Sequence, residues 1–421
     1  MHLFKYKGRL LYAEDVPVRA LAEKYGTPLY VYSEGTLKRH LHAYREAFDG
    51  FPNLICFALK ANSSLAVLSL LGKAGAGADI VSGGELFKAR KAGIPASKIV
   101  YAGVGKTEDE IRYALREGIL MFNVESPAEL AAIDRIAGEM KRRAPIALRV
   151  NPDIDPETHP YIATGLKEHK FGIPADEALE HYRLAGLLKN IEIIGIHKHI
   201  GSQITKVSPF VDALKKTLLL VDELKARGMD IQYLDMGGGL GIPYFPPVGP
   251  EREEAPPHPR ELARSILPLL KGRLGLTLIM EPGRSIAGNA GILVTKALYI
   301  KKGEGKDFLI VDAGMNDLIR PSLYGAYHRI LPVSMKKRRK YVQDVVGPIC
   351  ESGDFLAMDR ELPVVRPGEY IAVMSAGAYG FSMASNYNSR PFPAEVMVNG
   401  SRHRLIRKRQ TYEDLVREER M

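Results

Sequence analysis

The chain has 421 residues, of which 46% are hydrophobic and 26% charged, as expected for an ordinary soluble protein of roughly two or three domains. No stretch approaches the ~18 uninterrupted apolar residues of a membrane span, and the first residues lack the apolar core of a signal peptide, so we expect a cytoplasmic protein. Only two cysteines are present, Cys56 and Cys350, which leaves no disulfide framework or four-cysteine zinc site.

The net charge of +10 raises the possibility of an anionic partner such as nucleic acid. The densest basic runs, at residues 336–340 and 403–409, are short and lack interleaved aromatic side chains. We therefore interpret them as solvated loops and an exposed strand, and we expect no nucleic-acid partner.

The predicted elements settle into a regular order after the first fifty residues. Residues 2–13 are predicted to form two short strands about a turn at Lys7-Gly8, and helical patterns follow at 16–25 and 34–48. Apolar runs with strand character then end near Lys60, Ser82, Ala102, Asn123, Val150, His199, Met236 and Glu281. Between them lie helical patterns at 64–74, 83–92, 107–117, 126–142, 174–188, 207–227 and 258–272.

Eight strands separated by helices predict a (β/α)8 barrel of the TIM type from residue 30 to 290. An open doubly wound sheet is the alternative, because alternation alone does not show closure. Beyond residue 290 the pattern changes to β-runs at 293–300, 308–312, 341–346 and 370–375. We expect residues 291–421 to form a β-rich sandwich or barrel domain together with residues 1–29, closed by a short helix at 412–419.

In either fold the functional side chains should lie at the carboxyl ends of the strands. Polar and glycine residues stand at those positions: Lys60, Asp79 with Ser82, Gly103, Asn123 with Glu125, Arg149 with Asn151, His197 with His199, Gly237 to Gly239, and Glu281 with Arg284. Two loops on the same face, 151–172 and 241–259, are long enough to be lids or binding segments.

Lys60 ends the apolar run 54–59 and precedes a polar turn. At the end of a buried strand, desolvation would lower the pKa of its amine and favour the free base that a Schiff-base lysine needs. A lysine that extends its ammonium group out to water is the alternative for this residue taken alone.

Three other patterns at the strand ends carry chemistry. Gly237, Gly238 and Gly239 lack the third glycine of a dinucleotide fingerprint, which leaves a phosphate cradle or a tight turn. His197 and His199 point to one side of a strand, so a metal pair is conceivable, although a ring lying on a planar cofactor explains one of them equally well. No third ligand is evident, and we predict no metal. Glu281 could keep a pyridine protonated, or could pair with Arg284.

A lysine, a phosphate cradle, a stacking imidazole and a pyridine-facing carboxylate together describe a pyridoxal-phosphate site. The motifs 57–62, 199–203, 237–239, 281–284 and 350–354 occur together and in order. In these motifs the chain resembles the diaminopimelate decarboxylase family, which belongs to the alanine-racemase-like (fold type III) pyridoxal-phosphate enzymes. The resemblance covers nearly the whole length.

The resemblance implies a role for each matching residue. Lys60 would bind the cofactor as a Schiff base, His199 would lie against its ring, and Glu281 would keep its pyridine nitrogen protonated. Further cofactor contacts are implied for Asp79, Ser202, Gly237, Gly238, Gly239, Gly283, Arg284 and Tyr379. Substrate contacts are implied for Arg284, Arg320, Tyr324, Glu351 and Tyr379.

Cys350 resembles the family's proton donor, which with Glu351 would reach the active site from the other subunit of a homodimer. Cys56, within an apolar strand, is expected to be an inert buried side chain. The reaction implied is decarboxylation of meso-2,6-diaminopimelate at its D-centre to L-lysine, the last step of lysine biosynthesis.

Two alternatives stay open: a decarboxylase for another basic amino acid, ornithine or arginine, and a non-catalytic binding protein on the same fold. The second amino-acid head of diaminopimelate needs a guanidinium group for its carboxylate and an acid for its ammonium group. Arg320 and Glu351 therefore favour diaminopimelate. A binding protein would be expected to lose the lysine, the cysteine or the phosphate cradle, and all three are present.

Overall fold

The structure, a computed structural model, describes residues 2–154, 170–245 and 255–421. Contacts divide the chain into two compact units. The barrel unit is His40–Ile242 with Ala255–Ser285, and the β unit is Met1–Arg39 with Pro243–Glu254 and Ile286–Met421. From the sequence we expected the barrel unit to run from residue 30 to residue 290.

Eight parallel strands form the barrel unit, in the order in which they occur in the chain. They are β5 (Asn53–Ala58), β6 (Gly77–Ile80), β7 (Ile99–Tyr101), β8 (Met121–Val124), β9 (Ala144–Asn151), β11 (Ile191–His197), β12 (Tyr233–Asp235) and β13 (Thr277–Met280). The last strand pairs with the first, Met280 opposite Ile55, and β8 pairs with β9, so the sheet closes. This confirms the barrel and excludes the open-sheet alternative. A short strand, β10 (Ile173–Pro174), pairs only with β9.

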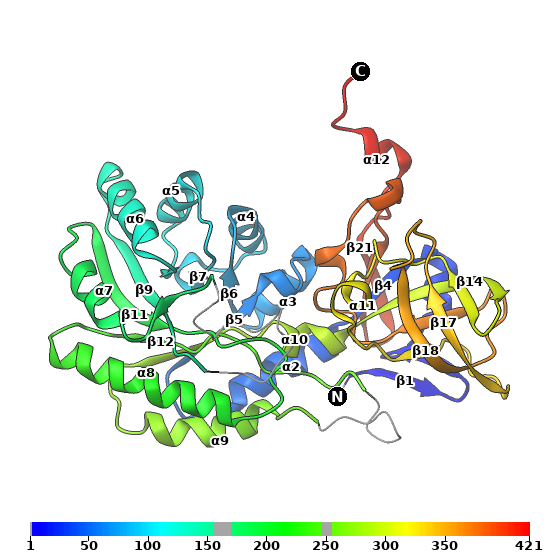
Figure 1. The fold of residues 1–421 in the computed structure, drawn as a ribbon, viewed down its shortest axis with the longest axis horizontal. Helices are drawn as coiled ribbons and strands as arrows, with labels where there is room; N and C mark the ends of the chain where they lie inside the picture. Colours follow the sequence, from blue (N-terminus) through cyan, green and yellow to red (C-terminus); the bar gives the residue numbers. More distant parts are fainter. Residues whose placement is uncertain (1, 155–169, 246–254) are drawn as a thin grey trace. The chain divides into compact units, whose positions relative to one another are not determined.

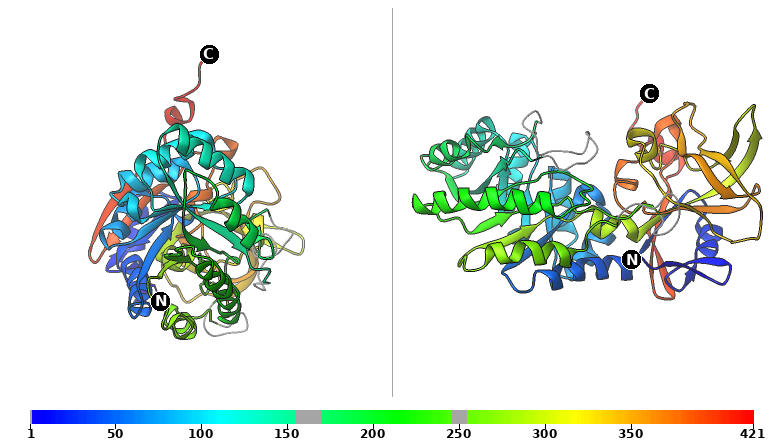
Figure 2. Two further views of the ribbon diagram at one scale, coloured as in Figure 1. Left: turned by 90° about the vertical axis from the view of Figure 1, so that its left-hand side faces the viewer. Right: turned by 60° about the horizontal axis from the view of Figure 1, so that its bottom comes forward.

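The helices of this unit surround its strands, as the left view of Figure 2 shows. They are α3 (Leu65–Lys73), α4 (Gly83–Lys91), α5 (Glu108–Glu117), α6 (Pro127–Glu139), α7 (Ala178–Ala185), α8 (Ser208–Ala226) and α9 (Pro259–Leu270), and most of α2 (Glu34–Ala47) also belongs here. The helix start predicted at Ser126 is present, since its hydroxyl accepts from the N–H of Glu129 while Pro127 occupies the first turn. The helix predicted at 174–188 is shorter than expected.

The interior of the barrel is apolar below its carboxyl end. One core cluster contains Cys56, Val100, Met121, Ala147, Ile194 and Ile279, each from a different strand. Cys56 is fully buried there, and burial raises the pKa of its thiol well above the ordinary value. The expected inert role of Cys56 therefore agrees with its position.

The β unit is built on the long strand β14 (Gly291–Lys302), which pairs with β4 (Leu29–Ser33), β15 (Asp307–Val311) and β19 (Tyr370–Val373) (Figure 1). Its other strands are β16 (Ile330–Pro332), β17 (Lys340–Val346), β18 (Phe355–Pro363), β20 (Ala394–Asn399) and β21 (Arg402–Arg407). From the sequence we expected no strand at the positions of β4, β16, β18 and β20. A helix, α12 (Tyr412–Val416), lies near the C-terminus.

The N-terminal hairpin belongs to this second unit. Strands β1 (Phe4–Lys7) and β2 (Leu10–Ala13) pair about a turn in which Gly8 has a φ of 60°. A third strand, β3 (Val16–Pro17), occupies the residues where we expected a helix to begin, and α1 (Val18–Tyr25) follows it. Phe4 and Leu11 share a core cluster with β4, β14 and β20.

Most of the two long loops, 151–172 and 241–259, lies outside the described residues, so their expected role as lids stays a prediction. Within the described ranges, no helix combines the length and the hydrophobicity that crossing a membrane requires.

Candidate functional site

Lys60 stands in a single 3-10 turn, Leu59–Ala61, directly after β5. Its Nζ lies 2.9 Å from Oδ2 of Asp79, the third residue of β6, and the lysine side chain is 37% exposed. We expected an enclosed, apolar surrounding for this amine, and the structure instead pairs it with an acid. Adjacent strand ends place the two residues side by side.

Asp79 is fully buried, and burial raises the pKa of its carboxyl group to about 7, an effect that the charge of Glu281 increases and that of Lys60 opposes. Its second oxygen, Oδ1, has no hydrogen-bond partner among the described residues. A buried oxygen of this kind can accept a proton, or a hydrogen bond from a polar ligand group bound next to Lys60.

Glu281 follows β13 and lies within a buried polar cluster. Its Oε2 is 3.5 Å from Nε2 of His197, and the amide nitrogen of Asn123 lies 3.4 Å from Oε1 of Glu281 and 3.2 Å from Oδ2 of Asp235. These four side chains come from four strand ends of the barrel. Asp235 also accepts from the N–H of Gly237 at 2.9 Å.

The pKa values of the two carboxyl groups in this cluster, Asp235 and Glu281, are shifted in opposite directions. Burial and the nearby Glu281 raise the pKa of Asp235 well above its ordinary value. Burial acts on Glu281 in the same direction, but the contacts with His197, Lys60 and Asp235 outweigh it and hold the pKa of Glu281 well below its usual range. These opposite directions favour the proton on Asp235 and the negative charge on Glu281.

Ligand atoms of His197, Asp235 and Glu281 all lie within 4.8 Å of one another, so these three residues could also hold a metal ion. This group includes His197 but not His199, unlike the pair that we considered from the sequence. Asn123 donates hydrogen bonds to the carboxyl groups of both Asp235 and Glu281. We therefore interpret the cluster as a polar network that holds Glu281 in place.

The three glycines after β12 admit no side chain. A Cβ at Gly237 would lie 2.6 Å from the carbonyl oxygen of Lys198, one at Gly238 would lie 2.3 Å from that of Glu281, and one at Gly239 would lie 2.4 Å from that of Gly201. The glycines therefore allow this segment to pack onto the neighbouring strand ends. The N–H groups of Gly237 and Gly238 donate to Asp235 and to Nδ1 of His199, so both already have partners.

His199 is half-buried, and its pKa is well below the ordinary value because of burial and because the cations of Arg149 and Lys60 are near. Its ring is thus neutral, and Nδ1 accepts the Gly238 N–H at 3.2 Å. A neutral, fixed imidazole of this kind is suited to lie against a planar ring.

The segment 281–284 is held close to Lys60. The carbonyl of Pro282 accepts from the N–H of Ala58 at 3.3 Å, and a Cβ at Gly283 would lie 3.0 Å from that of Ala61. Arg284 begins a short helix, α10 (Arg284–Ala287), and its Nη2 donates to the hydroxyl of Ser202 at 3.0 Å. The structure therefore brings Lys60, Glu281, Arg284 and Ser202 to one end of the barrel.

In the β unit, Arg320 opens the helix α11 (Arg320–Tyr324), which a left-handed Gly325 ends. Arg320 is buried, and its guanidinium group lies over the ring of Tyr244 at 4.8 Å from the centroid. The hydroxyl of Ser322 donates to the carbonyl of Gly353 at 2.6 Å. This contact joins the helix that carries Arg320 and Tyr324 to the loop 350–354.

That loop presents Cys350 and Glu351, both exposed. The N–H of Cys350 donates to the side chain of Asn388 at 2.9 Å, and Tyr387 donates its hydroxyl hydrogen to Glu351. Asp354 anchors the loop from within, accepting from the N–H groups of Met315 and Ile349, each at 2.6 Å.

Tyr379, the remaining predicted site residue, has a φ of 54° in the loop after β19. This left-handed conformation is costly for a side chain other than glycine or asparagine, and such residues are often found at functional sites.

Comparisons with known proteins agree with the motifs. Residues 34–288 match the family model described as pyridoxal-dependent decarboxylase, pyridoxal binding domain. The diaminopimelate decarboxylase of Aquifex aeolicus is 54% identical over 98% of this chain and 96% of its own length. The chain belongs to the diaminopimelate decarboxylase family. Members of this family are carboxy-lyases that use pyridoxal phosphate, and the resemblance drawn from the sequence is confirmed.

Solved structures of the same family have this fold. The diaminopimelate decarboxylase of Helicobacter pylori complexed with L-lysine matches with a TM-score of 0.90 at 46% identity, covering 95% of this chain and 98% of its own. The M. jannaschii enzyme matches with a TM-score of 0.93 at 40% identity, covering 100% and 98%.

The residues present fit a pyridoxal-phosphate cofactor. Lys60 offers a partly exposed amine, Glu281 an ionised carboxylate, and the 237–239 segment a backbone wall without side chains. The buried Oδ1 of Asp79 adds an acceptor that has no partner among the described residues. These features would suit imine formation with the cofactor and would favour a protonated ring nitrogen.

Sequence reasoning missed several supporting residues. Asn123, His197 and Asp235 were not assigned to Glu281, and the buried pair of Arg149 with Glu125, 2.8 Å apart, was not assigned a role. Glu125 also accepts from the N–H groups of Gly103 and Gly172, at 3.0 Å each. Except for Asp235, which lies within the glycine motif, each had been noted as a polar residue at a strand end, which was the available signal.

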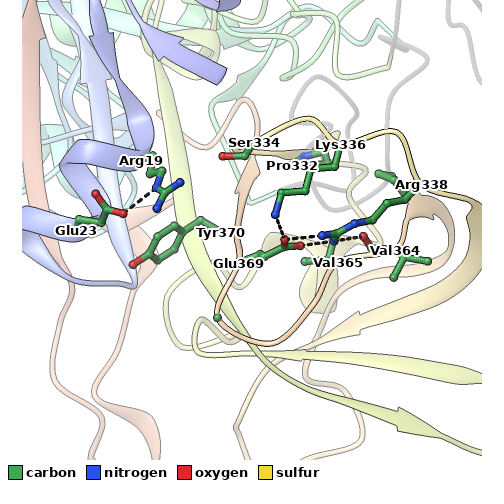
Figure 3. Close-up of a pocket in the computed structure, with 12 residues that line it drawn as sticks. Arg19, Glu23, Pro332, Ser334, Lys336, Arg338, Val364, Val365, Glu369 and Tyr370 are labelled. Atoms are coloured by element: carbon green, nitrogen blue, oxygen red, sulfur yellow. Dashed lines mark hydrogen bonds and ion pairs between the residues drawn. The ribbon is translucent and has the colours of Figure 1, made fainter. Parts of the chain in front are cut away.

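A cavity of about 220 Å³ lies in the β unit, apart from the residues described above (Figure 3). Lys336 and Arg338 line it, and both form ion pairs with Glu369. Burial acts to raise the pKa of the Glu369 carboxyl group, but hydrogen bonds and these cations outweigh it and lower the pKa to about 2. Arg19 likewise pairs with Glu23 at 2.7 Å. Because these cationic groups all pair with acids of the same cavity, we do not assign it a ligand.

Proposed function

We propose that this chain decarboxylates meso-2,6-diaminopimelate at its D-centre and releases L-lysine and CO2, with pyridoxal phosphate as the resident cofactor. The observation that carries the proposal is the meeting of Lys60 and Asp79, 2.9 Å apart, with Glu281 and its partner His197 at one end of the barrel. The names of the relatives, and the L-lysine in the H. pylori complex, support the same substrate class.

The cofactor would be held by Lys60, Asp79, His199, Ser202, Gly237, Gly238, Gly239, Glu281, Gly283, Arg284 and Tyr379. When bound, it supplies an electron sink for the pair of electrons that the departing carboxylate leaves behind. Lys60 would bind its carbonyl carbon, and the half-buried His199 would support its ring. Ser202, Gly238 and the backbone around Gly283 would bind its phosphate.

Glu281 would hold a proton on the ring nitrogen. The contacts with His197, Lys60 and Asp235 hold the pKa of its carboxyl group low, and the raised pKa of Asp235 favours the proton on that residue. The chain would thereby place a negative charge beside the ring nitrogen that must stay protonated.

The substrate residues follow from the two heads of diaminopimelate. The head that does not react carries a carboxylate and an ammonium group, which suit the guanidinium of Arg320 and the acid of Glu351. Arg284, Tyr324 and Tyr379 would complete the pocket. Cys350 would donate a proton from its thiol to the carbon that loses CO2.

Cys350 and Glu351 would act on the active site of a partner subunit in a homodimer. Both are exposed on the β unit, beside Tyr387, which is 43% exposed. Mixing subunits that carry Lys60→Ala with subunits that carry Cys350→Ala should restore about a quarter of wild-type activity, because half of the dimers then contain one intact site. Two inactive variants that stay inactive after mixing and subunit exchange would contradict this arrangement.

We also propose a cytoplasmic location. Both cysteines are free thiols, which is usual in a reducing compartment. Fractionation of the source cells, with an antibody against the chain, tests this.

The test of the function is L-lysine formation from meso-2,6-diaminopimelate by purified protein supplied with pyridoxal phosphate, with ornithine and arginine alongside. We expect product from diaminopimelate only. Product from ornithine or arginine alone would leave Lys60 and Cys350 in their roles but contradict those of Arg320 and Glu351.

A further inference from the structure

We propose that His328 is a positioning residue that fixes the guanidinium group of Arg320 and thereby determines how tightly the carboxylate of the distal head is bound. This inference rests on the proposed function, because it needs Arg320 to bind that carboxylate. Three sets of contacts within the β unit support it.

The first set fixes the tautomer of His328. Its Nδ1 lies 2.8 Å from the carbonyl oxygen of Met374, and since a carbonyl oxygen can only accept, Nδ1 carries the hydrogen. Its Nε2 lies 2.8 Å from Nη1 of Arg320, and since a guanidinium group can only donate, Nε2 is the acceptor. The two contacts together require a neutral ring with one defined tautomer.

The second set holds the imidazole itself. His328 is fully buried and precedes β16, while Met374 follows β19, the strand that pairs with β16. The N–H of Met374 donates to the carbonyl of Arg329 at 2.8 Å, which continues the ladder past both strands. Arg360 donates to the carbonyl of His328 at 3.0 Å, so the backbone is held from a further side.

The third set packs both Arg320 and His328 against the ring of Tyr244. Tyr244 lies under Arg320 at 4.8 Å and meets the ring of His328 edge-on at 5.3 Å. Arg320 is therefore held by a cation–π contact with Tyr244 and by a hydrogen bond with His328. Two such contacts restrict the orientation of the guanidinium group, and a bidentate bond to a carboxylate depends on that orientation.

Asparagine and glutamine separate this role from a purely structural one. Asparagine at position 328 can place its amide nitrogen where Nδ1 was and keep the bond to Met374, but has no atom at the position of Nε2. Glutamine can place its amide oxygen near the position of Nε2 and accept from Arg320. The positioning role predicts that His328→Gln retains more function than His328→Asn.

The experiment measures kcat and KM for meso-2,6-diaminopimelate in the holoenzyme, together with inhibition by L-lysine and by cadaverine. L-lysine keeps one carboxylate and cadaverine has none, so only L-lysine binding should depend on Arg320. We expect His328→Asn to raise KM and weaken L-lysine inhibition by about tenfold each, with a smaller change in kcat and in cadaverine inhibition. His328→Gln should lose about threefold or less.

Two further variants make the result decisive. His403→Asn is the matched control, since His403 lies in the same unit and contacts the hydroxyl of Tyr25 at 3.0 Å, and it should change neither inhibitor constant. Arg320→Lys tests the role of the guanidinium directly and should weaken L-lysine inhibition more than cadaverine inhibition.

Equal losses in the Asn and Gln variants, or equal losses for L-lysine and cadaverine, would overturn the inference while leaving the proposed function in place. Wild-type protein with no activity on diaminopimelate would overturn the proposed function and this inference with it.

Discussion

The two units hold their site residues in different ways. In the barrel unit, Asp79, Asp235 and Glu281 are buried at neighbouring strand ends and change one another's proton affinity. In the β unit, Arg320 stands on a five-residue helix and is held by His328 and Tyr244, while Cys350 and Glu351 stand on an exposed loop.

We expect this difference to divide tuning of the cofactor, in the barrel unit, from recognition of the distal head, around Arg320. Parallel strands deliver their end residues to one rim, so charges concentrate there and each tunes the others. In the β unit, Arg320 lies on a short helix, where a contact with an aromatic ring and a hydrogen bond with His328 hold it. Changes in the barrel should therefore act mainly on kcat, and changes around Arg320 mainly on KM. The predictions below test this division.

Replacing Lys60 by alanine should have the largest effect, because alanine has no amine with which to form the covalent bond to the cofactor. We expect turnover to fall by several orders of magnitude and borohydride no longer to trap the cofactor on the protein. Lys91→Ala, an exposed lysine on α4, is the control and should behave as wild type. Near-normal turnover in the Lys60 variant would refute the assignment.

Cys350→Ala is expected to lower kcat by about a hundredfold, since a positioned proton donor contributes that much or more. This variant tests how far the two units differ, because Cys350 would be a residue of the β unit that takes part in the reaction itself. Cys56→Ala is the matched change in the barrel core and should lower thermal stability while leaving kcat unaltered, because Cys56 is fully buried among apolar side chains. Steady-state kinetics and thermal melting of both variants distinguish the two cysteines.

Glu281→Gln should lower kcat by about thirtyfold, equivalent to roughly 2 kcal/mol, with a small change in KM. The neutral amide cannot hold a proton on the ring nitrogen as a carboxylate does. The absorption spectrum of the holoenzyme should shift with the loss of that proton, which kinetics alone would not show. A spectrum and a kcat equal to those of wild type would mean that the barrel cluster does not tune the cofactor.

Lys198→Met should stabilise the barrel unit by about 2 kcal/mol at neutral pH. Lys198 is fully buried, its Nζ has no hydrogen-bond partner among the described residues, and burial lowers the pKa of its amine to about 7, an effect that Asp235 opposes. Between this value and the ordinary 10.5, the unfolded chain binds more protons than the folded one, so the stability of the wild type rises with pH.

The Lys198→Met variant lacks this contribution, so its advantage over wild type should be largest at pH 7 and below and should shrink towards pH 10.5. Urea denaturation of both proteins at pH 7 and at about pH 9.5 measures the difference. An advantage that does not change with pH would mean that the amine is not titrating in this range.

Much of the barrel and its rim could be predicted, because each strand is a short apolar run followed at once by a polar or glycine residue. Lys60 and Glu281 were found in this way and lie at the same end of the closed sheet. The partners of Glu281 could not be found, since Asn123 and Asp235 are 112 residues apart in the chain and meet only when the barrel closes. The β unit was harder, because β4 lies far in sequence from both of its partners, β14 and β20.

The sequence by itself therefore determined the alternation of strands and helices, the order of the motifs and the family. Hydrophobic periodicity and glycine positions are local properties that any segment carries before it folds. Only the tertiary structure decided that the sheet closes, that Glu281 is supported by His197 and Asp235, and that His328 holds Arg320. These contacts join residues from different strands and loops, and packing of the whole unit, not the local pattern, selects them.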